Sequence, residues 1–266
     1  MKPYGIVRAV LTVCIFCAVC LCAAPGTAKT TDMSDLWWIH TESGWGIQLV
    51  QNNDTIFATL FVYGPDGQPT WYTATLAYQG SFNWSGILYK TAGPWFGTAS
   101  FDPTSVTVTA VGTMSFNAPT ISQGTLIYTV SGVQVLKVIE RQLLVYEDFN
   151  GSFASVMNQT GTGQACSPAE SFNGKAITAN ITQSGTAMTV VVTGNSDTCT
   201  FPGTYSQTGH FGRLIGTYLC TSGANGTFDF FEMVRNAFDF RMRTKLVPRP
   251  NCTINGHFVG VQPEGS

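Results

Sequence analysis

The sequence contains few residues in patterns that support catalysis. Its three histidines, His40, His210 and His257, are far apart along the chain. The chain has no His-Glu-x-x-His zinc motif, no Gly-x-Ser-x-Gly nucleophile elbow and no glycine-rich phosphate loop before a helix. We therefore expect no catalytic residues, no bound metal and no cofactor.

Three glutamates are the remaining candidates for acid–base chemistry. Glycoside hydrolysis needs two carboxyl groups about 5 to 9.5 Å apart, so Glu42, Glu140 and Glu232 serve only if the fold gathers two of them. Burial of Glu42 beside Trp45 would raise the pKa of its carboxyl group, whereas an exposed Glu42 is an ordinary strand-edge charge. A carbohydrate hydrolase is therefore the third functional hypothesis, behind two non-enzymatic ones.

Tryptophans and cysteines occupy different parts of the chain. All six tryptophans precede residue 100, and three of them lie in the stretch "DLWWIHTESGWG", residues 35–46. Four cysteines follow residue 160. Aromatic packing would hold the first part together, and disulfides would hold the second. We therefore expect a tryptophan-rich, barrel-like unit over residues 35–146 and a cysteine-containing β unit over residues 148–262.

The first 28 residues have the pattern of a secretory signal peptide. Lys2 and Arg8 form a basic start, an apolar run follows, and small residues mark a cleavage point near Ala28. No later apolar run is long enough to span a bilayer. We expect a periplasmic or extracellular protein with no transmembrane segment after signal cleavage; the alternative is an uncleaved N-terminal anchor.

Charge is sparse in the predicted mature chain. The 13 basic residues less Lys2 and Arg8 leave 11 against 15 acidic ones, a net charge of −4. The clearest basic cluster, "RMRTKLVPR" at residues 241–249, is typical of a solvated strand and turn. Without a basic patch, nucleic acid is not an expected partner. No sequence feature specifies an oligomeric state.

The cysteines that follow the predicted signal indicate two disulfides. An even number in an exported chain favours bridges, and four cysteines allow three pairings. A predicted hairpin centred on residues 209–210 places Cys199 and Cys220 at equal distances from its turn, where they would face each other. We expect this bridge, with Cys166 and Cys252 forming the second.

The remaining pattern is strand throughout. Seven strand-like segments follow one another in the first unit: "GWGIQLVQ", "TIFATLFVY", "TWYTATLAY", "SGILYKT", "SVTVTAVGTMSF", "GTLIYTV" and "VQVLKVIERQLLVY". In the fifth, Val106, Val108, Met114 and Phe116 alternate with polar residues and should share one face. Consecutive antiparallel strands form a meander, which loses its exposed edges by closing into a barrel. The expected fold class is all-β, with two antiparallel meander or barrel-like units, the second stapled by disulfides.

A two-residue turn on residues 52–53 would set the register of the first hairpin. It pairs Leu49 with Ile56 and Trp45 with Leu60, which places Trp45 in the core. A three-residue turn would exchange the faces, because a one-residue slip turns every side chain over. We prefer the two-residue turn because it separates apolar from polar residues better.

The next predicted turn sets Gly64 opposite Gln68 and brings Leu60 beside Tyr72. The face of this sheet that is turned away from the core mixes rings, hydroxyls and an amide. Its candidate ligand contacts are Gln48, Phe57, Phe61, Trp71 and Thr73. Such a face is an ordinary exposed sheet, the contact between the two units, or a platform on which a sugar or another flat ligand stacks.

The segments "DLWW", "ESGWGIQLVQ", "DTIFATLFVYGPDGQPTWY" and "GTLIYTVSGVQVLKVIERQ" together resemble a family of secreted proteobacterial proteins without an assigned function. The resemblance covers residues 35–142. Members of that family often carry Asn-Pro in place of Ile39 and His40, so this chain departs from the pattern there. The resemblance implies export and a β-barrel-like fold, and it implies no reaction.

The first unit also resembles barrels of the lipocalin and avidin type. Those barrels open with a Gly-x-Trp-like strand, and a basic residue from the last strand covers the tryptophan. The analogy implies that the Arg141 guanidinium lies on Trp45 or Trp38 as a structural contact. The alternative is that Arg141 is a solvated strand charge. Separately, the register that places Trp45 in the core leaves Trp37 and Trp38 to plug one end of the barrel.

Two functional hypotheses therefore lead. The first is an exported binding or interaction module for a carbohydrate or a small apolar ligand. The second is a structural or accessory envelope protein without a small-molecule ligand. A concave, aromatic-lined cavity with a few polar groups favours the first, and completely filled barrels favour the second.

Overall fold

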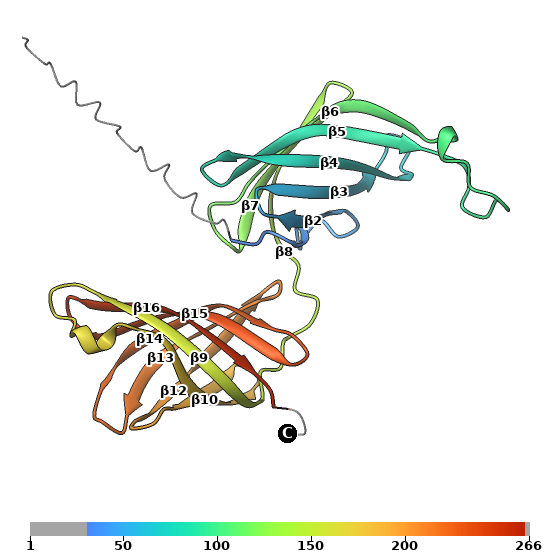
Figure 1. The fold of residues 1–266 in the computed structure, drawn as a ribbon. Helices are drawn as coiled ribbons and strands as arrows, with labels where there is room; N and C mark the ends of the chain where they lie inside the picture. Colours follow the sequence, from blue (N-terminus) through green and yellow to red (C-terminus); the bar gives the residue numbers. More distant parts are fainter. Residues whose placement is uncertain (1–30, 264–266) are drawn as a thin grey trace, which may run out of the picture.

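The computed structural model describes residues 31–263, which form two closed antiparallel β-barrels joined by one linker (Figure 1). The predicted signal peptide, residues 1–28, lies outside the described residues. The predicted all-β fold, with two antiparallel barrel units and disulfides in the second, is confirmed. Within the described range, no helix has the length and apolar character needed to cross a membrane.

The first barrel has eight strands in sequence order, and β1 closes it by pairing with both β2 and β8. The strands are β1 (Asp35–Trp38), β2 (Gly46–Asn52), β3 (Thr55–Tyr63), β4 (Pro69–Gly80), β5 (Asn83–Ala92), β6 (Thr107–Asn117), β7 (Gln123–Val130) and β8 (Val133–Arg141). A short 3-10 helix, η1 (Pro103–Ser105), lies in the β5–β6 connection. All of these strands fall inside the predicted unit of residues 35–146.

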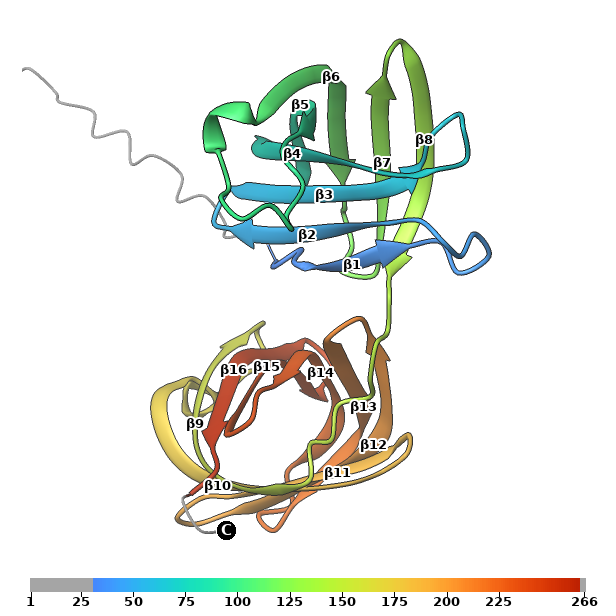
Figure 2. The ribbon, with the colours of Figure 1, turned by 90° about the vertical axis from the view of Figure 1, so that its right-hand side faces the viewer.

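The second barrel is closed by β9, which pairs with both β10 and β16. The strands are β9 (Gly151–Thr162), β10 (Phe172–Ser184), β11 (Ala187–Thr193), β12 (Thr198–Thr208), β13 (Phe211–Cys220), β14 (Asn225–Arg235), β15 (Asp239–Arg249) and β16 (Cys252–Val261). Figure 2 shows these strands as a ring. The 3-10 helix η2 (Pro168–Glu170) lies between β9 and β10.

The strand β1 is absent from the predicted segments, and it changes the roles of the first two tryptophans. Trp37 pairs with Ile47 on one side and Arg141 on the other. Its ring is fully buried, 5.1 Å from the ring of Phe116. Trp37 is therefore a core residue, and the prediction that it plugs the barrel end is wrong. Trp38 follows it in the strand, points the opposite way and is half-buried.

Trp45 precedes β2 and covers the core from one end of the barrel rather than lying within it. The ring is half-buried and packs against the core cluster. Its Nε1 donates to Glu42 Oε2 at 3.0 Å, and the Lys137 ammonium lies 5.6 Å from its ring. Its predicted pairing with Leu60 is wrong, because Leu60 pairs with Ile47.

The first hairpin turns one residue later than predicted. Residues 53 and 54 form the turn, with Asn53 at a φ of 52°, so Leu49 pairs with Ala58 instead of Ile56. This moves the register by two residues and leaves each side chain on its predicted face. The next turn agrees with the prediction: Leu60 pairs with Tyr72, and the Gly64 N–H donates to the Gln68 carbonyl at 2.9 Å.

The strand β6 departs from the predicted alternation. Met114 and Phe116 are buried as expected, but Val106 and Val108 are exposed. The pairing with β5 contains a bulge at Val111: Leu88 pairs with Gly112 and Tyr89 with Ala110, so Val111 has no partner in β5. Such a bulge turns the rest of the strand over, so the valines beyond it face outward.

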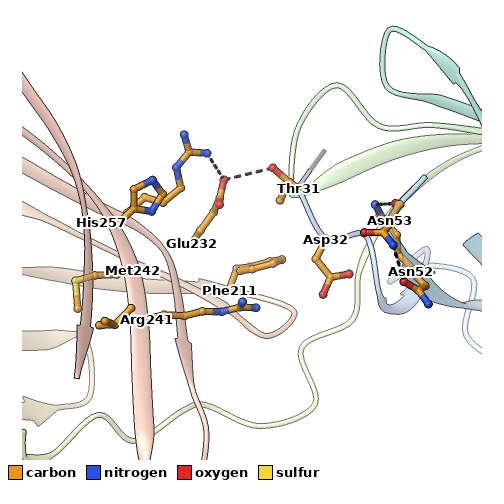
Figure 3. Close-up of a pocket in the computed structure, with 12 residues that line it drawn as sticks. Thr31, Asp32, Asn52, Asn53, Phe211, Glu232, Arg241, Met242 and His257 are labelled. Carbon is orange, nitrogen blue, oxygen red and sulfur yellow. Dashed lines mark hydrogen bonds and ion pairs between the residues drawn. The ribbon is translucent and has the colours of Figure 1, made fainter. Parts of the chain in front are cut away.

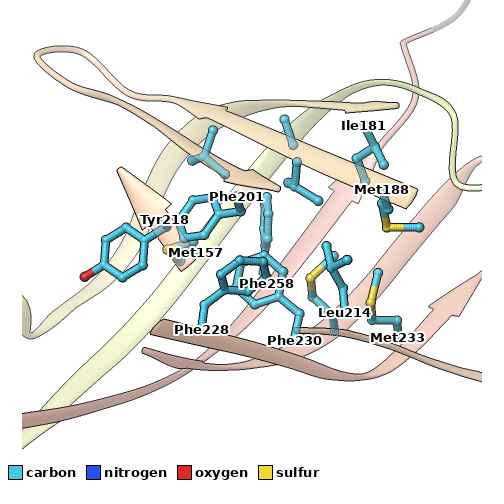
Figure 4. Close-up of a cluster of buried hydrophobic side chains, with 14 of the residues drawn as sticks. Met157, Ile181, Met188, Phe201, Leu214, Tyr218, Phe228, Phe230, Met233 and Phe258 are labelled. Atoms are coloured by element: carbon cyan, nitrogen blue, oxygen red, sulfur yellow. The ribbon is translucent and has the colours of Figure 1, made fainter. Parts of the chain in front are cut away.

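Side chains form a core inside each barrel, although the residue types differ. The first contains the tryptophans Trp37 and Trp84 with Phe116, in ring contacts of 5.1 and 6.0 Å. The second is filled largely by phenylalanines and methionines, part of which Figure 4 shows. The pairs of cysteines agree with the prediction. Cys199 and Cys220 bridge β12 and β13 directly, with 3.9 Å between their Cα atoms, and Cys166 bridges to Cys252.

A buried guanidinium lies where the two barrels meet. Arg141 is only 4% exposed and stacks between two rings, 4.6 Å from Trp37 and 4.9 Å from Phe211 of the second barrel. Its amino groups donate to the carbonyls of Asp32 and Ser34 at 2.7 and 3.1 Å, and its Nε donates to the Ile121 carbonyl. The basic residue of the last strand thus covers a first-strand tryptophan, but that tryptophan is Trp37 and not Trp45 or Trp38.

Asp35 completes this joint from the other side. Its Oδ2 accepts from Arg141 at 3.0 Å and from the ring of His210 at 2.8 Å. Burial acts to raise the pKa of Asp35, but His210 and Arg141 outweigh it and hold that pKa below its ordinary value. Gly209, at a φ of 57°, permits the approach, since a Cβ there would lie 2.2 Å from that same oxygen.

The joint predicts a large effect of one substitution. Arg141→Ala should lower the free energy of unfolding of the first barrel by about 3 to 5 kcal/mol, because it leaves the buried Asp35 carboxylate without its guanidinium partner. Urea unfolding followed by tryptophan fluorescence reports on this barrel alone, since all six tryptophans lie within it. The matched control is Lys137→Ala, also in β8, which removes an exposed ion pair with Glu42 and should lower the free energy of unfolding far less. Equal losses in the two variants would contradict the assignment.

Candidate ligand-binding site

The predicted ligand contacts lie on the outer wall of the first barrel. Phe61 and Trp71 are direct cross-strand partners and are 37% and 51% exposed. Thr59 sits between Gln48 and Thr73 across β2, β3 and β4, and Phe57, also exposed, lies two residues before Thr59. The fold thus brings the five residues onto one surface, but none of them lines the cavities described below.

This surface is not where the two barrels meet. The contacts between the barrels come from Arg141 and Asp35 on β8 and β1, and from Thr31, whose hydroxyl donates to Glu232 at 3.4 Å. The interpretation of the mixed face as the junction of the two units is therefore wrong. It remains an exposed sheet with three large rings.

The residues considered for acid–base chemistry are dispersed. Glu42 pairs with Lys137 and Glu232 with Arg243, while Glu140 lies 2.8 Å from His40. Glu42 is exposed, which agrees with the alternative of an ordinary exposed charge, and the hydrogen bond from Lys137 lowers its pKa. Each carboxylate has its own basic neighbour, and no two of these three glutamates share one.

The second barrel is closed at one end by the linker that enters it. Phe149 is fully buried there, with its ring 5.7 Å from that of Tyr205. Two glutamine side chains fix the linker: Gln183 accepts from the Phe149 N–H at 2.9 Å, and Gln207 accepts from the Glu147 N–H at 2.8 Å. In Figure 2 the linker crosses the end of this barrel that faces the viewer.

The opposite end of the second barrel is open and contains a cavity of about 450 Å³. Its wall is mainly apolar and comes from inward-facing residues of seven strands: Met157, Ile177, Val192, Phe201, Tyr218, Leu246 and Ile254. Phe172 and both cysteines of the β12–β13 bridge also line it. This open end is called the mouth below. Its size and composition are those of a small-molecule pocket, which is typically about 300 to 1,000 Å³ and mostly apolar.

Two stacked aromatic rings form part of the wall of the mouth. Phe201 and Tyr218 stack with their centroids 5.2 Å apart, and Phe201 also meets Phe228 edge-on at 5.3 Å. In Figure 4 the hydroxyl of Tyr218 points away from the buried cluster. Among the described residues this hydroxyl has no hydrogen-bond partner. Burial raises the pKa of Tyr218, and the charge of Glu170 raises it further, so the phenol stays protonated and can donate.

Charged residues line the rim of the mouth. Arg249 makes a two-point contact with Glu170, with both N–O distances at 2.9 Å, and its Nε donates to the Ala165 carbonyl at 2.8 Å. Lys175 lies 5.1 Å from the ring of Phe172. Within the described part of the chain, Lys175 has no carboxylate at ion-pair distance. The rim therefore offers one ammonium group that is available to an anionic or polar ligand group.

The rim is also tied together by disulfides and by one carboxylate. Asp197, in the β11–β12 turn, accepts from the hydroxyls of Thr221 and Ser222, each at 2.6 Å, in the neighbouring β13–β14 turn. These bonds, from Ser222 first, lower the pKa of Asp197 to about 2. The two disulfides hold the same end, so the mouth is a preformed opening rather than a flexible gap.

Two groups of possible metal ligands lie at this rim, and both contain disulfide cysteines. Cys166 and Cys252 approach Glu170, and Cys199 and Cys220 approach Asp197. A bridged cysteine has no thiolate, which is the form that binds metal ions. Each group is thereby reduced to a single carboxylate, which does not make a metal site.

A second cavity, of about 630 Å³, lies between the barrels and is polar (Figure 3). Asp32 and the amides of residues 51–53 form its wall on the first barrel. Arg241, Glu232 and His257 face them from the second. It lies between two barrels, whereas the mouth lies within one of them.

One part of the mouth, its stacked ring pair, could have been predicted from the sequence. The predicted hairpin that pairs Cys199 with Cys220 also pairs Phe201 with Tyr218, two residues further along each strand and on the same face. The disulfide prediction therefore also implies that these two rings are cross-strand neighbours. The opening itself depends on which end the linker fills, and no local pattern carries that information.

Comparisons of this chain with protein-family models, curated proteins and solved structures found no match. The resemblance to secreted proteobacterial proteins and the lipocalin–avidin analogy therefore stay predictions. The functional conclusion below comes from the geometry and chemistry of the chain itself.

The rim predicts an unusual titration. The Asp197 carboxyl group should titrate with a midpoint of about 2 when followed by NMR of its side-chain carbon, because protonation breaks two hydroxyl contacts. The lowered pKa means that these contacts stabilise the fold above the ordinary aspartate pKa of 3.8, and that this stability is lost as the pH falls toward 2. Ser222→Ala with Thr221→Val should return the midpoint toward 3.8. A wild-type midpoint near 3.8 would show that Asp197 does not accept these hydrogen bonds from the β13–β14 turn.

Proposed function

We propose that this chain is an exported binding module that holds a small apolar or amphipathic ligand in the mouth of the second barrel. The observation that carries the proposal is the cavity of about 450 Å³, apolar inside and ringed by charged groups, at the one end of that barrel which the linker leaves open. A pocket with an apolar wall and a few polar groups at fixed positions is the usual form of a small-molecule site.

The wall and the rim indicate the shape of the ligand. Phe201 and Tyr218 present stacked rings to one side of the cavity, which favours a flat or ring-containing apolar body. The Tyr218 hydroxyl and the Lys175 ammonium lie toward the solvent side, which favours a polar or anionic group at the exposed end. The ligand therefore enters with its apolar part first.

Export fits this role and the disulfides support it. Two bridges in the second barrel indicate an oxidising, extracytoplasmic setting. We propose a periplasmic or extracellular location, reached through the N-terminal signal sequence ending near Ala28. In this proposal the first barrel, whose interior is filled by tryptophan and phenylalanine rings, supports the second rather than holding a ligand.

Blocking the mouth should abolish binding. The probe is N-phenyl-1-naphthylamine, whose fluorescence rises in an apolar pocket, titrated onto the mature protein. Ile177→Trp places a large ring into the cavity from its wall and should weaken saturable binding by about 10-fold or more. The control is Leu219→Trp, which adds the same ring on the outer wall of the barrel, where Leu219 is exposed, and should leave the affinity within about 2-fold.

Two results would count against this proposal. If the wild-type protein shows no saturable binding of the probe or of dodecanoate, the chain is better described as a structural or accessory envelope protein. If Leu219→Trp weakens binding as much as Ile177→Trp, the probe binds elsewhere. Circular dichroism of each variant checks that the barrel is folded, so a loss of binding is not confused with a loss of structure.

A further inference from the structure

The connection between β5 and β6 presents two aromatic rings at its tip. Phe96 is 91% exposed and Trp95 is 67% exposed, and their ring centroids lie 5.5 Å apart. Phe101, in the same connection, is also exposed. In Figure 1 this loop extends beyond the ends of β5 and β6. The pair Trp95 and Phe96 is called the aromatic tip below.

The aromatic tip is a built turn. The Thr98 N–H donates to the Trp95 carbonyl at 3.1 Å, which closes the turn. The indole of Trp95 folds over Gly97, where a Cβ would lie 2.3 Å from the ring. At the base, Asp102 caps η1 by accepting from the Thr104 N–H at 2.9 Å. A preformed turn loses little conformational freedom when its rings are buried against another surface.

The chemistry around the tip is uncharged. Between Lys90 and Asp102 the sequence is "TAGPWFGTASF", without an acidic or basic residue. The indole N–H of Trp95 donates to none of the described residues. An exposed indole with a free N–H beside an apolar ring is the arrangement that favours the boundary between lipid headgroups and acyl chains.

We propose that the aromatic tip is a membrane-contact site that inserts into the interfacial region of a zwitterionic lipid bilayer. A lipid surface fits better than a protein partner, because a stable protein interface buries about 800 Å² on each side. Two aromatic side chains supply roughly 300 to 500 Å². Zwitterionic lipid fits better than anionic lipid, because the tip has no basic residue and the predicted mature chain has an excess of acidic ones.

The test is flotation of the full mature chain with phosphatidylcholine vesicles. Trp95→Ala with Phe96→Ala should reduce the vesicle-bound fraction by about 10-fold. The matched control is Trp71→Ala, which removes an exposed tryptophan from the flat outer wall of the same barrel and should change binding by less than about 2-fold. Binding should also change little from about 0.05 M to about 0.5 M salt, because no charge pairs with the headgroups.

Several outcomes would overturn the proposal. They are no flotation of the wild-type chain, an equal loss in Trp71→Ala, or binding that appears only with anionic vesicles and disappears with salt. A fourth is a concentration-dependent dimer that the double variant abolishes, since it would identify a second copy of the chain as the occupant. The failure of this test leaves the mouth of the second barrel untouched, because the two sites lie on different barrels and are tested with different probes.

Discussion

The buried guanidinium of Arg141 is the contact on which the architecture depends. It links the end of β8 to the residues that precede β1, and its planar group lies between Trp37 and the ring of Phe211 in the second barrel. A charge in this position is tolerated because carbonyls and Asp35 satisfy its hydrogen bonds. The same side chain thus contributes both to the closure of the first barrel and to its contact with the second.

The two barrels share the same closed topology but differ in how completely side chains fill their interiors. Tryptophan and phenylalanine rings fill the first, and Trp45 covers one of its ends. In the second, Phe149 from the linker fills one end, together with Phe153 and Tyr205. The other end is lined by aliphatic residues such as Ile177 and Val192 together with Phe201 and Tyr218, and it contains the cavity. Disulfides and Asp197 keep that end in shape without filling it. The opening results because the side chains at this end of the second barrel are too small to fill its interior.

Alternation with a period of two residues, together with turn residues, predicts most of the fold. They predict seven of the eight strands of the first barrel and the hairpin that sets Cys199 opposite Cys220. The strand β1 is missed because its four residues are too few to show alternation, and with it the burial of Trp37. The outward turn of Val108 follows from a bulge, which depends on pairing with β5 and leaves no local signal. The mouth of the second barrel was not predicted, because exposed rings are visible in a sequence and an unfilled barrel end is not.

The central claim is that ligands enter the mouth of the second barrel. The most direct measurement is a crystal structure of the protein grown with N-phenyl-1-naphthylamine. The account predicts electron density for the probe against Tyr218 and Ile177, with its apolar rings toward Phe201. Density in the cleft between the barrels, or on the outer wall beside Trp71, with the mouth empty, would contradict it.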